Sequence, residues 1–202
     1  MLGCRAFNVA EALVQAKQVG GFTLIEVLVS ILVLAIGVLG AAGAQLAALQ
    51  TRQATALTSA AVQLAGSLAD RMQANAQQSR GGDALNAYLQ LHYDALTDGP
   101  PAPPAAPCYA GADCNSAQMA AFDLYEISQA LHAGFPGARV TVCRDAAIVA
   151  QGAKGANTLA WPCAGGLNAP IVIKLGWRTR STDAGAEAQF APMVAIVAGA
   201  SS

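Results

Sequence analysis

Charged and aromatic side chains are scarce in this 202-residue chain. Charged residues make up 11% and aromatic residues 5%, whereas hydrophobic residues make up 54%, and the formal net charge is −1. There is no lysine or arginine cluster and no basic stretch interleaved with aromatics, so the sequence does not indicate a nucleic-acid partner. Once an apolar N-terminal segment is set aside, the remaining length suits one small globular domain and not two.

Groups that could carry catalysis are equally scarce. His92 and His132 fall on segments that we expect to be helical, without metal-ligand spacing or a nucleophile-elbow motif around them. No glycine-rich phosphate loop follows a predicted strand, and no C-x₂-C pair favours a zinc site. Asp70 and Arg71 are adjacent on a predicted helix, where capping or local pairing is the expected role. We therefore predict a protein that is not an enzyme and that has neither a metal site nor a cofactor.

One long stretch has no charge at all. From Val27 to Thr51 nearly every position is Val, Leu, Ile, Ala or Gly. A helix rises about 1.5 Å per residue and needs roughly 20 apolar residues to cross the hydrocarbon core of a membrane, so this stretch is long enough. Glu26 stands directly before this stretch, after the apolar residues Leu24 and Ile25. A carboxylate there costs on the order of 2.5–3.5 kcal/mol and commonly marks function, the alternative being a side chain that reaches the lipid headgroups.

The residues around Glu26 form a specific motif. The segment Gly21-Phe22-Thr23-Leu24-Ile25-Glu26 resembles the class III signal, or prepilin motif, of type IV pilins and type II secretion pseudopilins. The resemblance implies that a prepilin peptidase cleaves between Gly21 and Phe22, that Phe22 becomes an N-methylated N-terminus, and that residues 1–21 are a cleaved leader. We expect Phe22 and Glu26 to serve assembly, because the amine of one subunit can compensate the buried carboxylate of another only once they pack together.

Two further segments narrow the resemblance to minor pilins. Residues 68–75 (LADRMQAN) and 114–124 (CNSAQMAAFDL) look like recurring segments of PilV-type minor pilins, the type IV pilus modification proteins. The expected partners are other minor and major pilins, the prepilin peptidase and the inner membrane. The expected location is a single pass in the bacterial inner membrane, with the N-terminus cytoplasmic before cleavage, a periplasmic head, and incorporation into the pilus.

Three other interpretations stay open. A minor pseudopilin of type II secretion shares the N-terminal motif, and a tip-displayed adhesin would use the segments 99–113 and 146–167 as contact surfaces. An ordinary secretory signal could be cleaved after Ala42-Gly43-Ala44, although the leader is long and the helical pattern continues past Ala44.

The cysteines agree with export. Cys4 lies in the leader, and the other four, an even number in a small exported domain, allow three pairings into disulfides. The resemblance to PilV-type pilins favours the pairs Cys108–Cys114 and Cys143–Cys163.

The predicted fold class is α+β: a long N-terminal helix packed on a small antiparallel β-sheet, the lollipop architecture that the resemblance to pilins also implies. We expect this helix over residues 22–78, with 22–49 spanning the membrane, followed by a globular head of residues 79–202. Beyond the membrane segment an apolar stripe at helical spacing predicts docking on the head. The stripe comprises Leu57, Ala61, Leu64, Leu68 and Met72.

The head is expected to contain two helices and three strands. We predict helices over 83–96 and 116–132, the second capped by Ser116, with the proline-rich segment 99–107 as a loop between them. Alternating apolar residues predict strands over 139–144, 171–178 and 187–197. Pro192 marks the third as an edge strand or a bulge. Three sequential strands predict an antiparallel meander with one face covered by the long helix.

Overall fold

The computed structural model describes residues 20–80, 82–109, 112–151, 157–166, 168–179 and 190–199. The chain divides into two compact units, Met1–Gln50 and Thr51–Ser202, which are described separately below. Helix α1, Leu24–Ala74, contributes to both. Among the described residues it is the one helix whose length and composition would let it cross a membrane.

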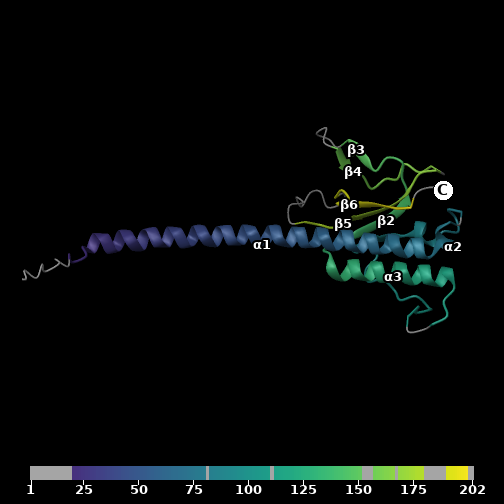
Figure 1. Ribbon diagram of the computed structural model, residues 1–202, viewed down its shortest axis with the longest axis horizontal. Helices are drawn as coiled ribbons and strands as arrows, with labels where there is room; N and C mark the ends of the chain where they lie inside the picture. The colour runs from purple at the N-terminus through teal and green to yellow at the C-terminus, as the bar shows by residue number, and fades with distance from the viewer. Residues whose placement is uncertain are drawn as a thin grey trace, which may run out of the picture. The chain divides into compact units, whose positions relative to one another are not determined.

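The second unit is built on a four-stranded antiparallel sheet. Its strands are β1 (His92–Asp94), β2 (Arg139–Arg144), β5 (Ile171–Gly176) and β6 (Val194–Gly199), in the order β1-β2-β5-β6. A separate hairpin of β3 (Val149–Gln151) and β4 (Asn157–Leu159) lies between β2 and β5 in the chain. The helical elements are α2 (Ala76–Ser79), the 3₁₀ turn η1 (Ala87–Gln90) and α3 (Ser116–Gly134), which runs beside the C-terminal part of α1 (Figure 1). This confirms the predicted α+β class.

The core lies between the sheet and the C-terminal part of α1. Ala61, Leu68 and Met72 of the predicted stripe are buried there, and Leu57 and Leu64 pack against the same cluster. The sheet contributes side chains that alternate along β2 and β5, among them Val140, Val142, Ile173 and Leu175. Complete burial of a side chain such as Leu68 contributes about 1.5–3 kcal/mol, so the stripe fixes this part of the helix on the sheet. The predicted covering of one sheet face by the long helix is confirmed.

The predicted helix over 83–96 is wrong. Residues 87–90 form a single 3₁₀ turn, opened by Asn86, whose side chain accepts a hydrogen bond from the Tyr88 N–H. Residues 92–94 pair with β2 as strand β1. Leu85, one of the apolar residues whose spacing suggested the helix, is 77% exposed. Pairing with the edge of β2 therefore overrides a weak local pattern, and His92 lies on a strand and not on a helix.

Helix α3 begins where it was predicted, but its cap is the preceding residue. The side chain of Asn115 accepts from the Gln118 N–H at 2.9 Å, and the Gln118 side chain accepts from the Asn115 N–H at 3.0 Å. This capping box satisfies two backbone donors reciprocally, which a serine at the first helical position does not do.

The predicted meander is confirmed as β2-β5-β6, with additions that the sequence did not indicate. Strand β2 has the predicted bounds, β5 ends at Gly176, and β6 begins after Pro192 and lies at the sheet edge, as that proline suggested. Residues 187–189 of the third predicted strand lie outside the described residues. The added elements are β1 and the hairpin of β3 and β4, each strand of which is only three residues long.

Candidate processing and assembly site, and the polar anchors of the head

The residues on either side of the predicted cleavage point precede α1. Residues 20–23 are in neither helix nor strand, and the Phe22 side chain is 82% exposed. A Cβ added at Gly21 would meet nothing within 4 Å, so the surrounding space is open. The peptide bond between Gly21 and Phe22 therefore lies in accessible, non-helical backbone, the form in which a peptidase can bind it.

Glu26 lies in the first turn of α1. Its backbone N–H donates to the Thr23 carbonyl at 3.0 Å, and the Ser30 hydroxyl donates to the Glu26 carbonyl at 2.7 Å. A carboxylate in the first turn of a helix interacts favourably with the helix dipole. No ion pair joins the Glu26 carboxylate to any other residue in the described part of the chain. In the isolated subunit this carboxylate is therefore available to a partner.

The apolar residues that follow Glu26 are also exposed. Every Leu, Ile and Val of α1 from Leu24 to Leu49 is exposed in the isolated chain. A contiguous apolar surface of this length is typical of a membrane segment or of a contact with other proteins. Among its described residues, the first unit thus brings together an accessible predicted cleavage point, a carboxylate without an ion pair and an exposed apolar helix.

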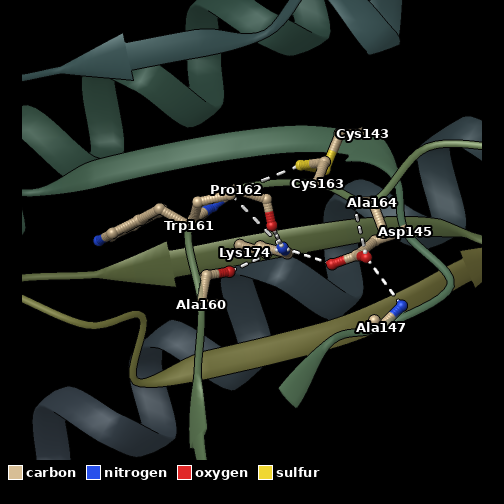
Figure 2. Close-up of a disulfide and its surroundings, with 9 residues drawn as sticks. All are labelled: Cys143, Asp145, Ala147, Ala160, Trp161, Pro162, Cys163, Ala164 and Lys174. Carbon is tan, nitrogen blue, oxygen red and sulfur yellow. Dashed lines mark hydrogen bonds and ion pairs between the residues drawn. A yellow bond between two sulfur atoms is a disulfide. The ribbon is translucent and has the colours of Figure 1, made fainter. Parts of the chain in front are cut away.

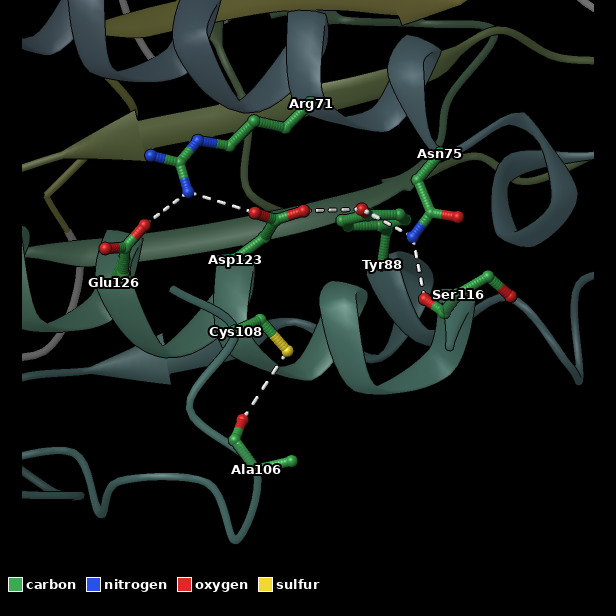
Figure 3. Close-up of polar contacts among 8 residues, drawn as sticks. All are labelled: Arg71, Asn75, Tyr88, Ala106, Cys108, Ser116, Asp123 and Glu126. Atoms are coloured by element: carbon green, nitrogen blue, oxygen red, sulfur yellow. Dashed lines mark hydrogen bonds and ion pairs between the residues drawn. The ribbon is translucent and has the colours of Figure 1, made fainter. Parts of the chain in front are cut away.

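In the second unit, Arg71 connects α1 to α3. Its guanidinium donates to Oδ1 of Asp123 at 2.9 Å and also forms an ion pair with Glu126 (Figure 3). Asp123 is only 4% exposed, and its other oxygen accepts from the Tyr88 hydroxyl at 2.7 Å. The predicted local role of Arg71 is therefore wrong, because its partners lie more than 50 residues away in the sequence.

These contacts shift the pKa values of the groups involved. The hydrogen bond to Glu126 is the largest cause of the raised pKa of Arg71, against a smaller lowering by burial. Burial, and then the bond to Asp123, raises the pKa of the Tyr88 hydroxyl. Both groups therefore keep their protons at every physiological pH, and the network holds fixed donors.

Asn75 extends the network to the start of α3. Its side-chain amide donates to the Ser116 carbonyl at 2.7 Å and to the Tyr88 hydroxyl at 3.2 Å (Figure 3). The two segments that resemble PilV-type pilins, 68–75 and 114–124, therefore contact each other directly. Sequence reasoning missed this contact, although Asp123 and Glu126 stand about one turn apart on α3, the spacing at which two carboxylates can meet one guanidinium.

A second polar anchor lies on the other side of the sheet. Lys174 and Asp145 are both 0% exposed, and Lys174 Nζ lies 2.5 Å from Asp145 Oδ2 (Figure 2). Lys174 also donates to the carbonyls of Ala160 at 2.7 Å and Pro162 at 2.9 Å. Asp145 Oδ1 accepts from the N–H groups of Ala147 and Ala164, at 2.9 and 3.1 Å. Among the described residues, Asp145 Oδ2 has no partner other than the Lys174 ammonium.

Lys174 alternates along β5 with Ile173 and Leu175 of the core, so its side chain lies on the opposite face of the sheet. The structure shows that this face is covered as well, so every residue of β5 is buried. Burial raises the pKa of Asp145, but the hydrogen bond from Lys174 and those from the Ala147 and Ala164 N–H groups outweigh it and hold the pKa below its ordinary value. A buried ion pair is tolerated when further hydrogen bonds satisfy its remaining groups, as the bonds of Lys174 and of Asp145 Oδ1 do here.

The cysteines of the head lie beside these anchors. The structure joins Cys143 to Cys163 (Figure 2). The neighbours of Cys163 in the chain are bound by the second anchor: the Pro162 carbonyl accepts from Lys174, and the Ala164 N–H donates to Asp145. The structure also joins Cys108 to Cys114, just before α3. The Cα atoms are 6.3 and 5.8 Å apart, within the usual range for disulfides. Non-reducing peptide mapping tests both pairs.

The two histidines do not meet. His92 is exposed on β1, whereas the His132 ring nitrogen Nδ1 lies 2.8 Å from the hydroxyl of Tyr93, which also donates to the Gly99 carbonyl. Among the residues that the structure describes, no group of three or more His, Cys, Asp or Glu side chains could hold a metal ion.

Comparison with known proteins bears on the N-terminal segment. A family model described as the prokaryotic N-terminal methylation motif matches residues 16–42. No curated protein and no solved structure matches the chain. The match supports a type IV pilin-type or pseudopilin-type subunit, a class of structural proteins that are processed by prepilin peptidase and assemble with other pilins. Together with the apolar N-terminal helix, it fits anchoring in a membrane.

Proposed function

We propose that this chain is a PilV-type minor pilin, a structural subunit that helps to initiate and modify type IV pili. One observation carries the proposal: the methylation motif at residues 16–42 coincides with an accessible Gly21-Phe22 junction, an exposed apolar helix and a Glu26 that forms no ion pair with any described residue. None of these features serves the folding of the head. Each of them is required for processing and for packing against other subunits.

The proposed mechanism follows from the charges. Cleavage after Gly21 frees a positively charged amine on Phe22, and methylation keeps that charge. Packing of α1 against the helices of other pilins brings an amine of one subunit to the Glu26 carboxylate of another. A buried charge is tolerated only when it is paired, so the pair favours one register of the two helices, as a buried polar residue does in coiled coils.

The head supports the PilV assignment. The two PilV-like segments form one interface through Arg71, Asn75, Ser116 and Asp123. In this proposal residues 1–21 are the leader, 22–49 cross the inner membrane, and residues 79–202 form a periplasmic head whose disulfides suit an oxidising compartment.

The processing step is tested by the mass and N-terminal sequence of the mature protein. We expect N-methylated Phe22 at the N-terminus. Gly21→Ala should slow cleavage and Gly21→Trp should block it, whereas the matched change Gly20→Ala, also in open space, should leave it unchanged. A mature N-terminus at Gln45 would identify an ordinary secretory signal, and an intact Met1 in purified pili would contradict processing altogether.

Deletion of the gene separates the related functions. Loss or reduction of pili with normal protein secretion supports a minor pilin. Loss of secretion with normal pili would identify a pseudopilin of type II secretion, since the methylation motif fits both classes. Normal pili and normal secretion with lost attachment to surfaces would identify an adhesin.

A further inference from the structure

A hollow of about 680 Å³ opens on the sheet face opposite the one that α1 covers. Val140 and Val142 of β2 point into the core, so the alternating residues Arg139, Thr141 and Cys143 point to the opposite face. These three, together with His92 of the neighbouring strand, line one side of the hollow. Its volume falls within the range of small-ligand sites.

Three hydrogen-bond donors stand together on this face. We call His92, Arg139 and Thr141 the donor row. His92 and Thr141 are paired across β1 and β2, where opposite Cβ atoms lie about 4.5–5.5 Å apart. Arg139 is two residues from Thr141 on the same strand, or about 7 Å. A single small group on a ligand can therefore contact the guanidinium and the hydroxyl together.

No hydrogen bond or ion pair within the described part of the chain involves a side chain of the donor row. Thr141 is only 7% exposed, and no hydrogen bond is found between its hydroxyl and any described residue. The Arg139 guanidinium lies 4.7 Å from the centre of the Trp161 ring, and no described carboxylate pairs with it. None of the described residues that line the hollow is acidic. Among the described residues, a hydroxyl without a hydrogen-bond partner and a guanidinium without a carboxylate therefore lie side by side, and an anionic ligand would satisfy both.

The opposite wall is apolar. Trp161 and Phe190 pack edge to face, with ring centroids 5.8 Å apart, and both also line the hollow. They rest directly on β5, because a Cβ at Gly176 would lie 3.1 Å from each ring. Lys174 holds the carbonyls of Ala160 and Pro162 on either side of Trp161. The wall is thus fixed before any ligand arrives, which reduces the cost of ordering the site on binding.

We propose that this hollow binds a carboxylate carried on an aromatic or branched apolar body. The guanidinium of Arg139 receives the carboxylate, a geometry that Arg favours, and the Thr141 hydroxyl donates to it. The apolar body lies against Trp161 and Phe190. Two sources share this chemistry: a free aromatic acid and the C-terminal carboxylate of a peptide chain. The inference does not depend on the proposed role in pili.

Calorimetric titration of the full mature chain in detergent micelles tests the site, with empty micelles as the blank. The probes are N-acetyl-L-phenylalanine, its amide, and a pentapeptide ending in phenylalanine with a free or an amidated carboxyl group. We expect saturable binding of at least one free carboxylate, and binding at least about tenfold weaker for the matching amide. Tighter binding of the pentapeptide identifies a chain terminus as the source, and equal binding identifies a free acid.

The affinities of substituted proteins test whether the ligand binds at the donor row. Arg139→Gln should weaken it about 10- to 100-fold and the isosteric Thr141→Val about threefold. Arg80→Gln, the same change at an exposed arginine on the end of α2, should leave it unchanged. Near-ultraviolet circular dichroism checks that each variant folds. If Arg139→Gln does not fold, the affinity of Thr141→Val, which keeps the shape of the side chain, tests the proposed site. Absence of saturable binding, equal binding of acid and amide, or wild-type affinity in Thr141→Val would overturn the proposal.

Discussion

The Arg71 guanidinium lies 2.9 Å from the carboxylate of Asp123, and this contact joins the last turns of α1 to α3. Asp123 is buried and Arg71 is partly exposed, so the pair stands at the edge of the core. The Tyr88 hydroxyl also donates to Asp123, and Arg71 also pairs with Glu126. The end of the long helix is therefore attached to the head by apolar packing on one side and by charge-assisted hydrogen bonds on another.

Removal of the buried partner should destabilise the head. Asp123→Ala leaves the Tyr88 hydroxyl without its acceptor and Arg71 with Glu126 alone. We expect the free energy of unfolding to fall by about 1.5–3 kcal/mol, the range for a hydrogen bond to a charged group. Urea unfolding followed by near-ultraviolet circular dichroism measures it.

The matched control is Glu126→Gln. The Glu126 side chain is 39% exposed, and an ion pair screened by solvent contributes about 0–1 kcal/mol. Equal losses from Asp123→Ala and Glu126→Gln would mean that burial of Asp123 does not set the strength of the contact.

The sequence was most informative where a regular pattern met a buried face. The stripe along α1 and the alternation in β2 and β5 predicted the core because helix and strand periodicities determine which side chains share a face. The same reasoning failed for residues 83–96, where Leu85, Leu89 and Tyr93 stand about a turn apart. Strand β1 there is only three residues long, and it pairs with residues of β2 that lie 45 to 49 positions later in the chain, which local spacing cannot reveal.

The Lys174–Asp145 pair should make stability depend on pH. The pKa of Asp145 is lower in the folded than in the unfolded chain, so the folded state binds fewer protons. The stabilisation is complete above the unfolded pKa of about 3.9 and is lost as the pH falls through the folded pKa. We expect urea unfolding to show little change from pH 7 to pH 5 and a progressive loss of stability below about pH 4.

Lys174→Met should reverse that dependence. At pH 7 it leaves a buried carboxylate unpaired, which costs about 3–5 kcal/mol. Without the ammonium the pKa of Asp145 rises, so protonation relieves the penalty and the difference from wild type should shrink below pH 4. The double variant Lys174→Met/Asp145→Asn keeps an acceptor for the Ala147 and Ala164 N–H groups and should recover part of the loss at pH 7. A constant difference between wild type and Lys174→Met at every pH would contradict the coupling.

No local signal in the sequence marked Lys174 as buried. A lysine among apolar residues of a strand is ordinarily read as facing solvent, and the partners that bury it come from the chain around Asp145 and from 160–164. Its burial depends on a second layer over the sheet, which is a property of the tertiary structure. The N-terminal site differs in this respect: Gly21, Phe22 and Glu26 all lie in the segment 21–26, so the sequence alone was enough to identify the motif.

Non-reducing peptide mapping should recover Cys108 with Cys114 and Cys143 with Cys163. The two pairs are 6 and 20 residues apart in the sequence, and a longer closed loop restricts the unfolded chain more. Replacement of both Cys143 and Cys163 by Ala should therefore cost about 3 kcal/mol, and more than the same change at Cys108 and Cys114. Free thiols at these positions, or a different pairing, would show that the assignment is wrong.

The last prediction is that Glu26 serves assembly and not the folding of the head. It lies in the first turn of α1, within the first unit, and no described residue pairs with its carboxylate. Glu26→Gln should therefore leave processing, both disulfides and the near-ultraviolet spectrum unchanged. Loss of one charge-assisted contact between subunits should lower recovery with other pilins about tenfold or more, as measured by co-purification from membranes and from sheared fibres. Glu126→Gln, the same chemical change on the head, is the control and should be recovered normally. Recovery of Glu26→Gln equal to wild type, with N-methylated Phe22 confirmed, would mean that Glu26 reaches the lipid headgroups and that no amine–carboxylate pair sets the register of the helices.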